Sequence, residues 1–246
     1  MDSRDAPEPG GEVAPRYRKA DAAGAIDARR TAVVVIDMVN HQVTPGRWFL
    51  ADTESRGLDT TYFVDRLKTL VLPAHRRLLP AARSAGARVV YLRIGSLAAD
   101  YADASPATRD LFPLWEAHDA SPACAVIDEL QPQPSDLDIL KTGSGGFTTS
   151  SLDVHLRNMG VENVLYTGVA TNACVLATAA SGFDLGYRGF LVSDATATFT
   201  QRMQDITEEI IGFAMTEVVT TDHIIGRLRA GRGTGNSATE PDTGQC

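Results

Sequence analysis

The sequence predicts an α/β protein in which about six mostly parallel strands form a doubly wound sheet with helices on both faces, giving three layers. Short apolar runs, typical of strands buried on both faces, alternate with longer segments of helical period. Several of the helical segments are closed by glycine, a common helix C-terminus. Strands are expected at residues 32–36, 87–92, 137–140, 163–169, 189–192 and 217–220, and helices at residues 72–85, 150–159, 173–185 and 207–215.

The first half of the chain supplies two strands, a helix and a long irregular region. The run AVVVI at residues 32–36 has no polar residue, and ARVVYL at 87–92 is nearly as apolar. Between them, residues 72–85 carry apolar side chains at helical spacing and end at Gly86. Residues 95–134 contain five prolines, so we expect loops that are long enough to cover a cleft or reach another subunit.

The second half continues the alternation. LDIL at residues 137–140 and NVLYTGV at 163–169 are strand-like, and between them Leu152, Leu156 and Met159 share one helical face. Small and apolar residues then predict the helix at 173–185, followed by the strand at 189–192, the helix at 207–215 and the last strand at 217–220. Because ligands bind at the carboxyl ends of such strands, the functional site is expected there.

The two ends of the chain look unlike the middle. Residues 1–30 are polar and without sustained period, which predicts an arm that is mobile or lies on a partner surface. Residues 227–246 contain almost nothing to bury and are expected to be a flexible tail. The single catalytic or binding domain is therefore expected at residues 31–226.

Composition excludes several classes of protein. The chain has 246 residues, of which 43% are hydrophobic and 22% charged, as in ordinary globular domains. Its formal net charge of −8 leaves no surplus cations for a nucleic-acid backbone. No apolar stretch approaches the roughly 18 residues that span a bilayer, and the N-terminus lacks the apolar centre of a signal peptide. We expect a cytoplasmic protein without nucleic-acid or membrane partners.

Cysteine and histidine spacing argues against metal chemistry. Cys124, Cys174 and Cys246 are too far apart for a zinc site or a disulfide framework. The five histidines show no metal-binding pattern, so neither a metal nor another cofactor is expected. GSGG at residues 143–146 lacks the spacing of a phosphate loop and is interpreted as a tight helix entry.

Three reactive side chains follow three of the predicted strands. Asp37 and Lys141 come directly after the first and third strands, and Cys174 lies a few residues after the fourth. Parallel strands bring these positions to one edge, where a thiol with an acid and a cation forms a plausible nucleophilic site. The predicted helix start at Cys174 also favours the thiolate. Each residue alone has a structural explanation, as a buried thiol, a turn cap or a solvated charge, but their joint placement favours catalysis.

Four sequence blocks resemble one known family, the isochorismatase-like cysteine hydrolases, which include nicotinamidases, N-carbamoylsarcosine amidases, and ureidoacrylate and biuret amidohydrolases. The resemblance spans about residues 31–227 and implies an isochorismatase-like, Rossmann-like fold. The block that contains the cysteine is the most specific. The blocks are VVVIDMVN, LKTGSGGF with the helix after it, LYTGVATNACV, and LVSDATAT leading to EVVTTDH.

The resemblance implies a role for each residue of the trio. Cys174 would be the nucleophile, Asp37 the general base, and Lys141 the cation that holds the Asp37 carboxylate and stabilises the thiolate. A cis peptide bond is implied between Val169 and Ala170, with the Ala170 and Cys174 N–H groups forming an oxyanion hole. The implied reaction is hydrolysis of a C–N bond in a small carboxamide or ureido compound through a thioester, and a homo-oligomer is implied as well.

Departures from the family pattern narrow this expectation. Val39 replaces a frequent glutamine, and the Asp-x-His metal motif of nicotinamidases is absent. The presence of the cysteine favours C–N hydrolysis over isochorismatase-type vinyl-ether hydrolysis. That reaction remains one alternative, and a catalytically idle binding or assembly member of the same fold is another.

Four residues near the expected site are candidates for substrate contacts: Asn40, Arg93, Phe147 and Asn172. Arg93 would bind a carboxylate or carbonyl, or else pair with the acidic loop that follows it. Phe147, like Trp48, would line a pocket or belong to the core. Asn172 would bind substrate or cap the helix after it. Specificity is also expected from the loops at 95–134 and from Thr200 and Gln201.

Overall fold

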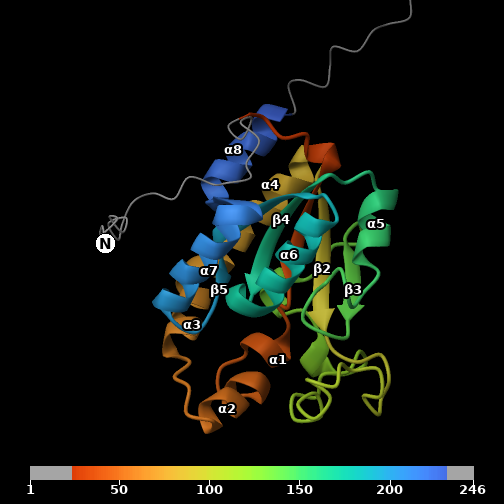
Figure 1. Ribbon diagram of the computed structural model, residues 1–246, viewed down its shortest axis with the longest axis vertical. Coiled ribbons are helices and arrows are strands. Elements are labelled where there is room, and N and C mark those ends of the chain that lie inside the picture. Colours follow the sequence, from red (N-terminus) through yellow and green to blue (C-terminus); the bar gives the residue numbers. More distant parts are fainter. Residues whose placement is uncertain (1–23, 232–246) are drawn as a thin grey trace, which may run out of the picture.

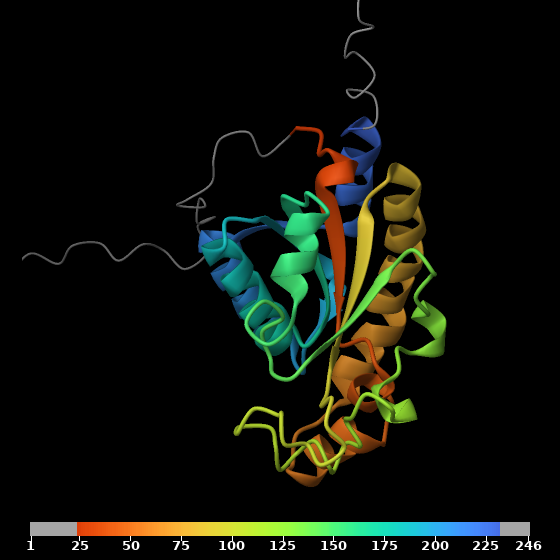
Figure 2. The ribbon, with the colours of Figure 1, turned by 90° about the vertical axis from the view of Figure 1, so that its right-hand side faces the viewer.

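A computed structural model describes residues 24–231 and places a six-stranded sheet between two layers of helices (Figures 1 and 2). Every pair of neighbouring strands is parallel, and the strand order is β3-β2-β1-β4-β5-β6. The predicted fold class is confirmed. The strands are β1 (Thr31–Ile36), β2 (Arg88–Ile94), β3 (Leu137–Lys141), β4 (Asn163–Val169), β5 (Arg188–Ala197) and β6 (Thr216–Val219).

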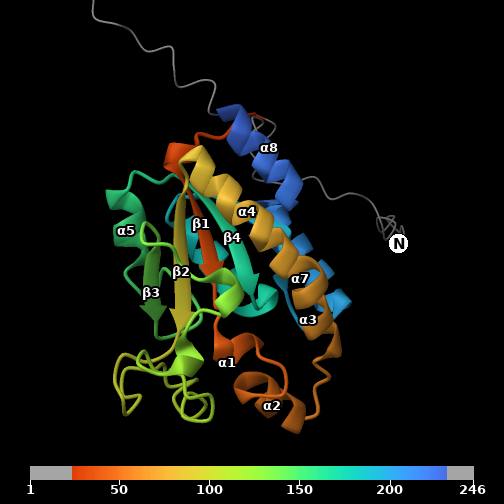
Figure 3. The ribbon, with the colours of Figure 1, turned by 180° about the vertical axis from the view of Figure 1, so that it is seen from behind.

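Helices cover the two faces of the sheet. Their bounds are α1 (Asn40–Val43), α2 (Trp48–Ser55), α3 (Thr61–Arg66), α4 (Leu72–Ala85), α5 (Leu152–Asn158), α6 (Leu176–Asp184), α7 (Gln201–Ala214) and α8 (Thr221–Gly231). Figure 3 shows α3, α4 and α8 on one face, and the side view of Figure 2 shows α5, α6 and α7 on the other. Among residues 24–231, no helix is both long and apolar enough to cross a membrane.

Side chains of the central strands alternate between two cores, one on each face. Val33 and Val35 of β1 pack in the core with α4 and α8, whereas Val34 and Ile36 pack in the core with α5 and α6. Each such side chain contributes about 1.5–3 kcal/mol when it is fully buried. Burial on both faces explains why the strands read as continuous apolar runs rather than as an alternating pattern.

The strand order reverses between β1 and β4, so the chain leaves these two neighbours in opposite directions. A crevice forms outside the carboxyl ends of parallel strands at such a point. In Figure 1 these ends face the part of the molecule that holds α1, α2 and the loops of residues 95–134. This edge of the sheet is where the predicted site residues lie.

Several elements extend beyond their predicted bounds. A continuous helical segment of α3, a π-helical stretch (Leu67–Val71) and α4 replaces the helix expected at 72–85 alone. Helix α7 begins at Gln201 because the Thr200 hydroxyl caps it by accepting the Met203 N–H. Strand β5 runs on to Ala197 through polar residues that interrupt the apolar pattern.

Both predicted domain boundaries differ from the structure. Ile26 is buried, and a 3-10 helix (Ala28–Arg30) leads into β1, so the fold begins before Thr31. Helix α8 continues through residue 231, with Leu228 buried and the Arg227 guanidinium bonded to the Gly24 carbonyl. Short segments from the two ends thus pack together. The remainder of the predicted arm and tail, residues 1–23 and 232–246, lies outside the described residues.

Candidate functional site

The carboxyl ends of three strands bring Asp37, Lys141 and Cys174 together. Asp37 directly follows β1, Lys141 ends β3, and Cys174 lies in a π-helical turn (Thr171–Val175) between β4 and α6. The Lys141 ammonium lies 2.9 Å from Asp37 Oδ2, and the Cys174 thiol interacts with both charged groups. All three side chains are buried, although Cys174 retains 9% exposure.

The backbone conformation around Asp37 helps to bring the three side chains together. Asp37 adopts a left-handed conformation with φ of 53°, which non-glycine residues seldom adopt, so the chain turns sharply as it leaves β1. On the neighbouring strand, Gly168 has φ of 99°, and a Cβ there would lie 2.0 Å from the Ile36 carbonyl oxygen. Only glycine lets β4 approach β1 this closely just before the nucleophile turn.

Burial governs the charges of the trio. Burial raises the pKa of Asp37, and the attraction of Lys141 opposes that rise. Burial would lower the pKa of Lys141, but the Asp37 carboxylate and the Cys174 thiol raise it above its ordinary value. Burial and the Asp37 charge together raise the pKa of Cys174 to about 12, against the pull of Lys141.

The resting thiol is therefore protonated at neutral pH. Burial and the adjacent Asp37 carboxylate thus oppose the thiolate that the predicted helix start favours. The Asp37 carboxylate faces the Lys141 ammonium, the Ile94 N–H and the Cys174 thiol. The thiol proton therefore lies beside an acceptor, as general base catalysis requires.

The peptide bond between Val169 and Ala170 is cis, the geometry that the family resemblance implies. The Ala170 carbonyl oxygen accepts hydrogen bonds from the N–H groups of Ala173 and Val175, at 3.0 and 3.2 Å. Ala170 thus anchors the first turn around Cys174 through its carbonyl group.

Arg93 does not face the trio, contrary to one interpretation of its position. Its guanidinium lies 2.6 Å from Asp138 and 2.8 Å from Asp119, so two carboxylates already satisfy it. Strand alternation gives the reason, because Leu92 and Ile94 of β2 point into the core that contains Cys174. Arg93 between them points to the opposite face.

The candidate aromatic residues differ in burial. Phe147 is buried and stacks on Tyr187 with ring centroids 5.2 Å apart, within the core on the α5–α7 face that also contains Cys174. The Arg47 guanidinium lies 3.9 Å above the Trp48 ring, which is partly exposed.

Asn172 lies beside the nucleophile but does not cap the helix. The turn that contains it has no side-chain cap, and its amide oxygen accepts the Thr198 hydroxyl at 2.6 Å. Asn172 is exposed two residues before Cys174, so it stays a candidate for substrate contact. Thr200 caps α7, and Gln201 accepts the Tyr62 hydroxyl at 2.9 Å.

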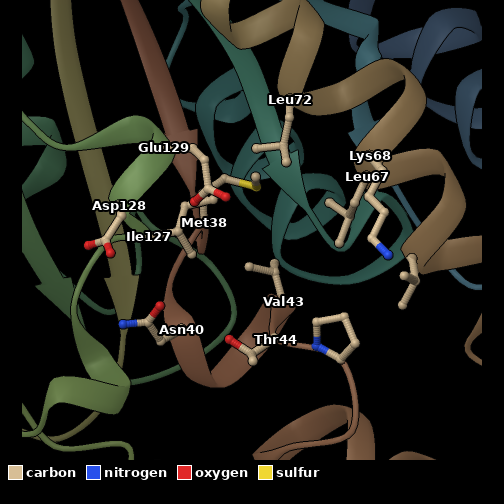
Figure 4. A pocket seen from close by; sticks show the side chains of 12 residues that line it. Met38, Asn40, Val43, Thr44, Leu67, Lys68, Leu72, Ile127, Asp128 and Glu129 are labelled. Atoms are coloured by element: carbon tan, nitrogen blue, oxygen red, sulfur yellow. The ribbon is translucent and has the colours of Figure 1, made fainter.

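Asn40 lines a pocket of about 320 Å³ together with Met38, the residue that follows Asp37 in the chain (Figure 4). None of Asp37, Lys141 and Cys174 lines it. The Asn40 amide donates to the Pro122 carbonyl at 2.9 Å, which ties α1 to the loop above it. The structure therefore places Asn40 near the site but not against the nucleophile.

Sequence reasoning missed two buried polar residues close to the trio. His41 lies 2.9 Å from the Ile94 carbonyl oxygen, and Gln204 accepts the Thr171 hydroxyl at 2.8 Å, at the start of the nucleophile turn. The apolar pattern predicts a start at residue 207 for α7, which leaves Gln204 outside that helix. No sequence motif marks His41, because its role depends on packing against a distant strand.

Cys124 does not belong to the trio, and the described part of the chain shows no cluster of metal ligands beside it. Cys124 is buried beside Ile94, 3.6 Å from its carbonyl oxygen, and Cys246 lies outside the described residues. Between residues 24 and 231, no three His, Cys, Asp or Glu side chains are grouped to hold a metal ion.

Comparison with known proteins agrees with the fold. The isochorismatase domain model matches residues 31–223. Ureidoacrylate amidohydrolase RutB of Stutzerimonas stutzeri is 32% identical over 190 residues, covering 70% of this chain and 71% of that protein. RutB of Caulobacter segnis is 33% identical over 189 residues, covering 70% and 74%.

Solved structures show the same architecture. A cysteine hydrolase from Pseudomonas syringae superposes with a TM-score of 0.70 at 28% identity, covering 84% of this chain and 96% of that one. N-carbamoylsarcosine amidase from Thermoplasma acidophilum gives a TM-score of 0.59 at 27% identity, covering 78% and 97%. The strand order, the trio at the strand ends and these matches together show that the chain belongs to the isochorismatase family of hydrolases.

Proposed function

We propose that this protein is a cysteine-dependent amidohydrolase that cleaves a C–N bond of a small ureido or carboxamide compound. The observation that carries the proposal is the buried ion pair of Asp37 and Lys141 beside the Cys174 thiol. A buried acid, cation and thiol in mutual contact satisfy the requirements of nucleophilic catalysis, because the thiol has a proton acceptor at hand. A buried cysteine of purely structural use would need neither charge.

The proposed cycle begins with the protonated thiol. As the Cys174 sulfur bonds to the substrate carbonyl carbon, its proton passes to the Asp37 carboxylate. Asp37 then delivers that proton to the departing nitrogen as the C–N bond breaks, leaving an acyl thioester and a free amine or ammonia. Water adds to the thioester, giving its proton to Asp37, and the sulfur leaves and regains a proton from Asp37.

Lys141 keeps its charge through this cycle. Its ammonium lies within ion-pair distance of Asp37, so it lowers the free energy of the carboxylate in the resting site. When the proton moves to Asp37, the same cation stabilises the sulfur anion. The backbone N–H groups of Ala170 and Cys174 are the proposed oxyanion hole, and such donors are each worth about 10²- to 10³-fold in rate.

A ureido compound is the favoured substrate class. The relatives are named for ureidoacrylate and N-carbamoylsarcosine, and both compounds carry a carbamoyl group on nitrogen. This chain shares the domain and the fold with such relatives. We therefore expect recognition of a planar N–C(=O)–N unit above Cys174.

An ammonia-release screen tests this function. Ureidoacrylate, biuret, N-carbamoyl amino acids, nicotinamide and maleamate are supplied to the full-length protein, and we expect turnover of at least one ureido compound. Cys174→Ala should reduce turnover at least about 10³-fold, and Cys174→Ser should bind substrate but turn over feebly. Full activity of Cys174→Ala would exclude the thioester cycle. Release of pyruvate from isochorismate, without ammonia from any amide, would assign vinyl-ether hydrolysis instead.

The proposed partners are this small molecule and a second copy of the chain. Helix α7 exposes Met203, Ile206 and Ile210, which are spaced to share one helical face. An apolar face of this kind on a surface helix fits self-association.

A further inference from the structure

A histidine without a role in the proposed cycle is buried four residues after Asp37. His41 belongs to the short helix α1 and is 0% exposed. Its ring stacks on Trp115 with a centroid distance of 6.3 Å. Its Nε2 lies 2.9 Å from the Ile94 carbonyl oxygen, and its Nδ1 lies 3.1 Å from the Gln42 amide nitrogen.

These two contacts define one protonation state of the ring. A carbonyl oxygen only accepts, so Nε2 carries the hydrogen, and Nδ1 accepts from the Gln42 amide. Burial lowers the pKa of His41 to about 4, the Ile94 carbonyl opposes this, and the cations Lys141 and Arg93 add to the lowering. Near neutral pH His41 is therefore an uncharged donor and carries no proton into the reaction.

Ile94, whose carbonyl accepts from His41, lies on β2, and β2 lies between β1 and β3 in the sheet. Ile94 is in register with Lys141, and the next N–H, that of Gly95, donates to the Lys141 carbonyl at 3.0 Å. The N–H of Ile94 itself interacts with the Asp37 carboxylate and lowers its pKa. The backbone of residues 94 and 95 thus contacts both the Asp37 carboxylate and the Lys141 main chain.

There is little room for this peptide to move. A Cβ at Gly95 would lie 2.9 Å from the Cys124 sulfur and 3.1 Å from the Ala117 carbonyl oxygen. The main chain is therefore tightly packed at Gly95, and the imidazole contacts the carbonyl just before it. The ring holds the Ile94 carbonyl in a fixed direction.

We propose that His41 is a positioning residue for the Asp37–Lys141 pair, because it holds the Ile94 carbonyl within the segment whose Ile94 N–H faces Asp37 and whose Gly95 N–H donates to the Lys141 carbonyl. His41 touches neither substrate nor sulfur in this role. The inference rests on the proposed function, since it assumes that Asp37 is the base.

Two His41 variants, one that keeps the ring and one that keeps a donor, test the proposal. His41→Phe keeps a ring against Trp115 but removes the donor, whereas His41→Gln keeps an N–H near the Nε2 position. We expect His41→Phe to lower kcat about 10- to 100-fold with little change in KM, because small misplacements of catalytic groups are costly. His41→Gln should recover part of that loss.

The pH profile separates positioning from mere folding. The Ile94 N–H lowers the pKa of Asp37, so its displacement in His41→Phe should raise that pKa and move the acid limb of kcat/KM to higher pH. The other groups that face this region are unchanged in both variants: Lys141, Cys174 and Cys124, with Arg93 held by Asp119 and Asp138. The acid limb of His41→Gln should stay near that of the native protein.

The outcomes distinguish this inference from the proposed function. If Cys174→Ala is inactive while His41→Phe keeps the native kcat and acid limb, the positioning role is excluded and the amidohydrolase stands. If Cys174→Ala stays active, the proposed function itself is excluded.

A measurement on the native protein covers the case in which His41→Phe does not fold. Nitrogen-15 NMR of the imidazoles, with His41→Gln to assign the signal among the five histidines, should show the Nε2–H tautomer. That signal should not titrate between about pH 5.5 and 9. An Nδ1–H tautomer, or a pKa near the ordinary value for histidine, would contradict the proposal.

Discussion

At the residue scale, the site solves the problem of keeping a nucleophile unreactive until substrate arrives. With its pKa near 12, the Cys174 thiol is neutral at rest, and the Asp37 and Lys141 charges neutralise each other. Transfer of one proton from sulfur to Asp37 exchanges one ion pair for another around the same ammonium. The buried site therefore keeps the same net charge before and after deprotonation, which avoids the large cost of an unpaired buried ion.

Removal of the cation should disable the base. Lys141→Met leaves Asp37 buried without its partner, so the pKa of Asp37 rises and the acid limb of kcat/KM moves to higher pH. We expect kcat/KM at neutral pH to fall about 10²- to 10⁴-fold, the worth of general base catalysis. The control is Lys68→Met, because Lys68 is exposed and lines the pocket that contains Asn40 but none of the trio. A normal acid limb in Lys141→Met, with native near-ultraviolet circular dichroism, would contradict the assigned role of Lys141.

Which residues could be predicted from sequence depends on what positions them. Asp37 directly follows β1 and Lys141 ends β3, and parallel strands end at a common edge, so the meeting of these residues can be predicted from the chain alone. Arg93 also lies at a strand end, but the alternation of β2 turns it to the opposite face, where Asp119 and Asp138 bind it. Its direction depends on strand register, which its own neighbours in sequence do not fix.

At the scale of elements, the junction of β1 and β4 sets the distance between base and nucleophile. Gly168 is in register with Ile36 in this junction. Gly168→Ala would place a methyl group 2.0 Å from the Ile36 carbonyl oxygen at a φ of 99°. The strands would have to separate just where Asp37 and the Cys174 turn leave the sheet.

A second glycine serves as a control, because it has a positive φ like Gly168 but no steric clash. Gly57 has φ of 88°, but a Cβ added there would have no atom within 4 Å, so Gly57→Ala should lower the free energy of unfolding by only about 1 kcal/mol. Gly168→Ala should lower it by about 3 kcal/mol more, and any folded fraction should lose activity. Urea unfolding of both variants measures the difference. Equal losses of stability would show that the close approach of β4 to β1 does not matter.

Elements were predictable where burial alone shapes the sequence. Strand β4 has the predicted bounds because all seven of its residues are buried, whereas β5 continues into half-buried Ser193 and Asp194 that carry no strand pattern. The short helices α1 and α2 escaped prediction because they are held by tertiary contacts, such as the Asn40 N–H to the Ala125 carbonyl. Local propensity has little weight in helices this short.

At the scale of the whole molecule, helix α7 exposes an apolar face that the packing of a single chain does not require. Helix α7 buries Thr207 and Ile211 toward the sheet and exposes Met203, Ile206 and Ile210 on the other side. The Met203 sulfur lies 4.0 Å from the Asn172 amide nitrogen, two residues before the nucleophile. This apolar face of α7 therefore reaches the border of the candidate site.

If a second copy covers this face, assembly and activity should be linked. Ile206→Asp combined with Ile210→Asp places two charges on the apolar face, and we expect the mass in solution to fall to that of one 26.3 kDa chain. Activity should fall with it, because the Asn172 border of the site loses its cover. Val154→Asp, at an exposed apolar position on α5, is the matched control and should change neither property. Light scattering coupled to gel filtration measures the mass. A native protein that is already monomeric would exclude this interface and leave α7 as a solvent-facing helix. The proposed catalytic function would still stand, because the contacts of the trio lie within one chain.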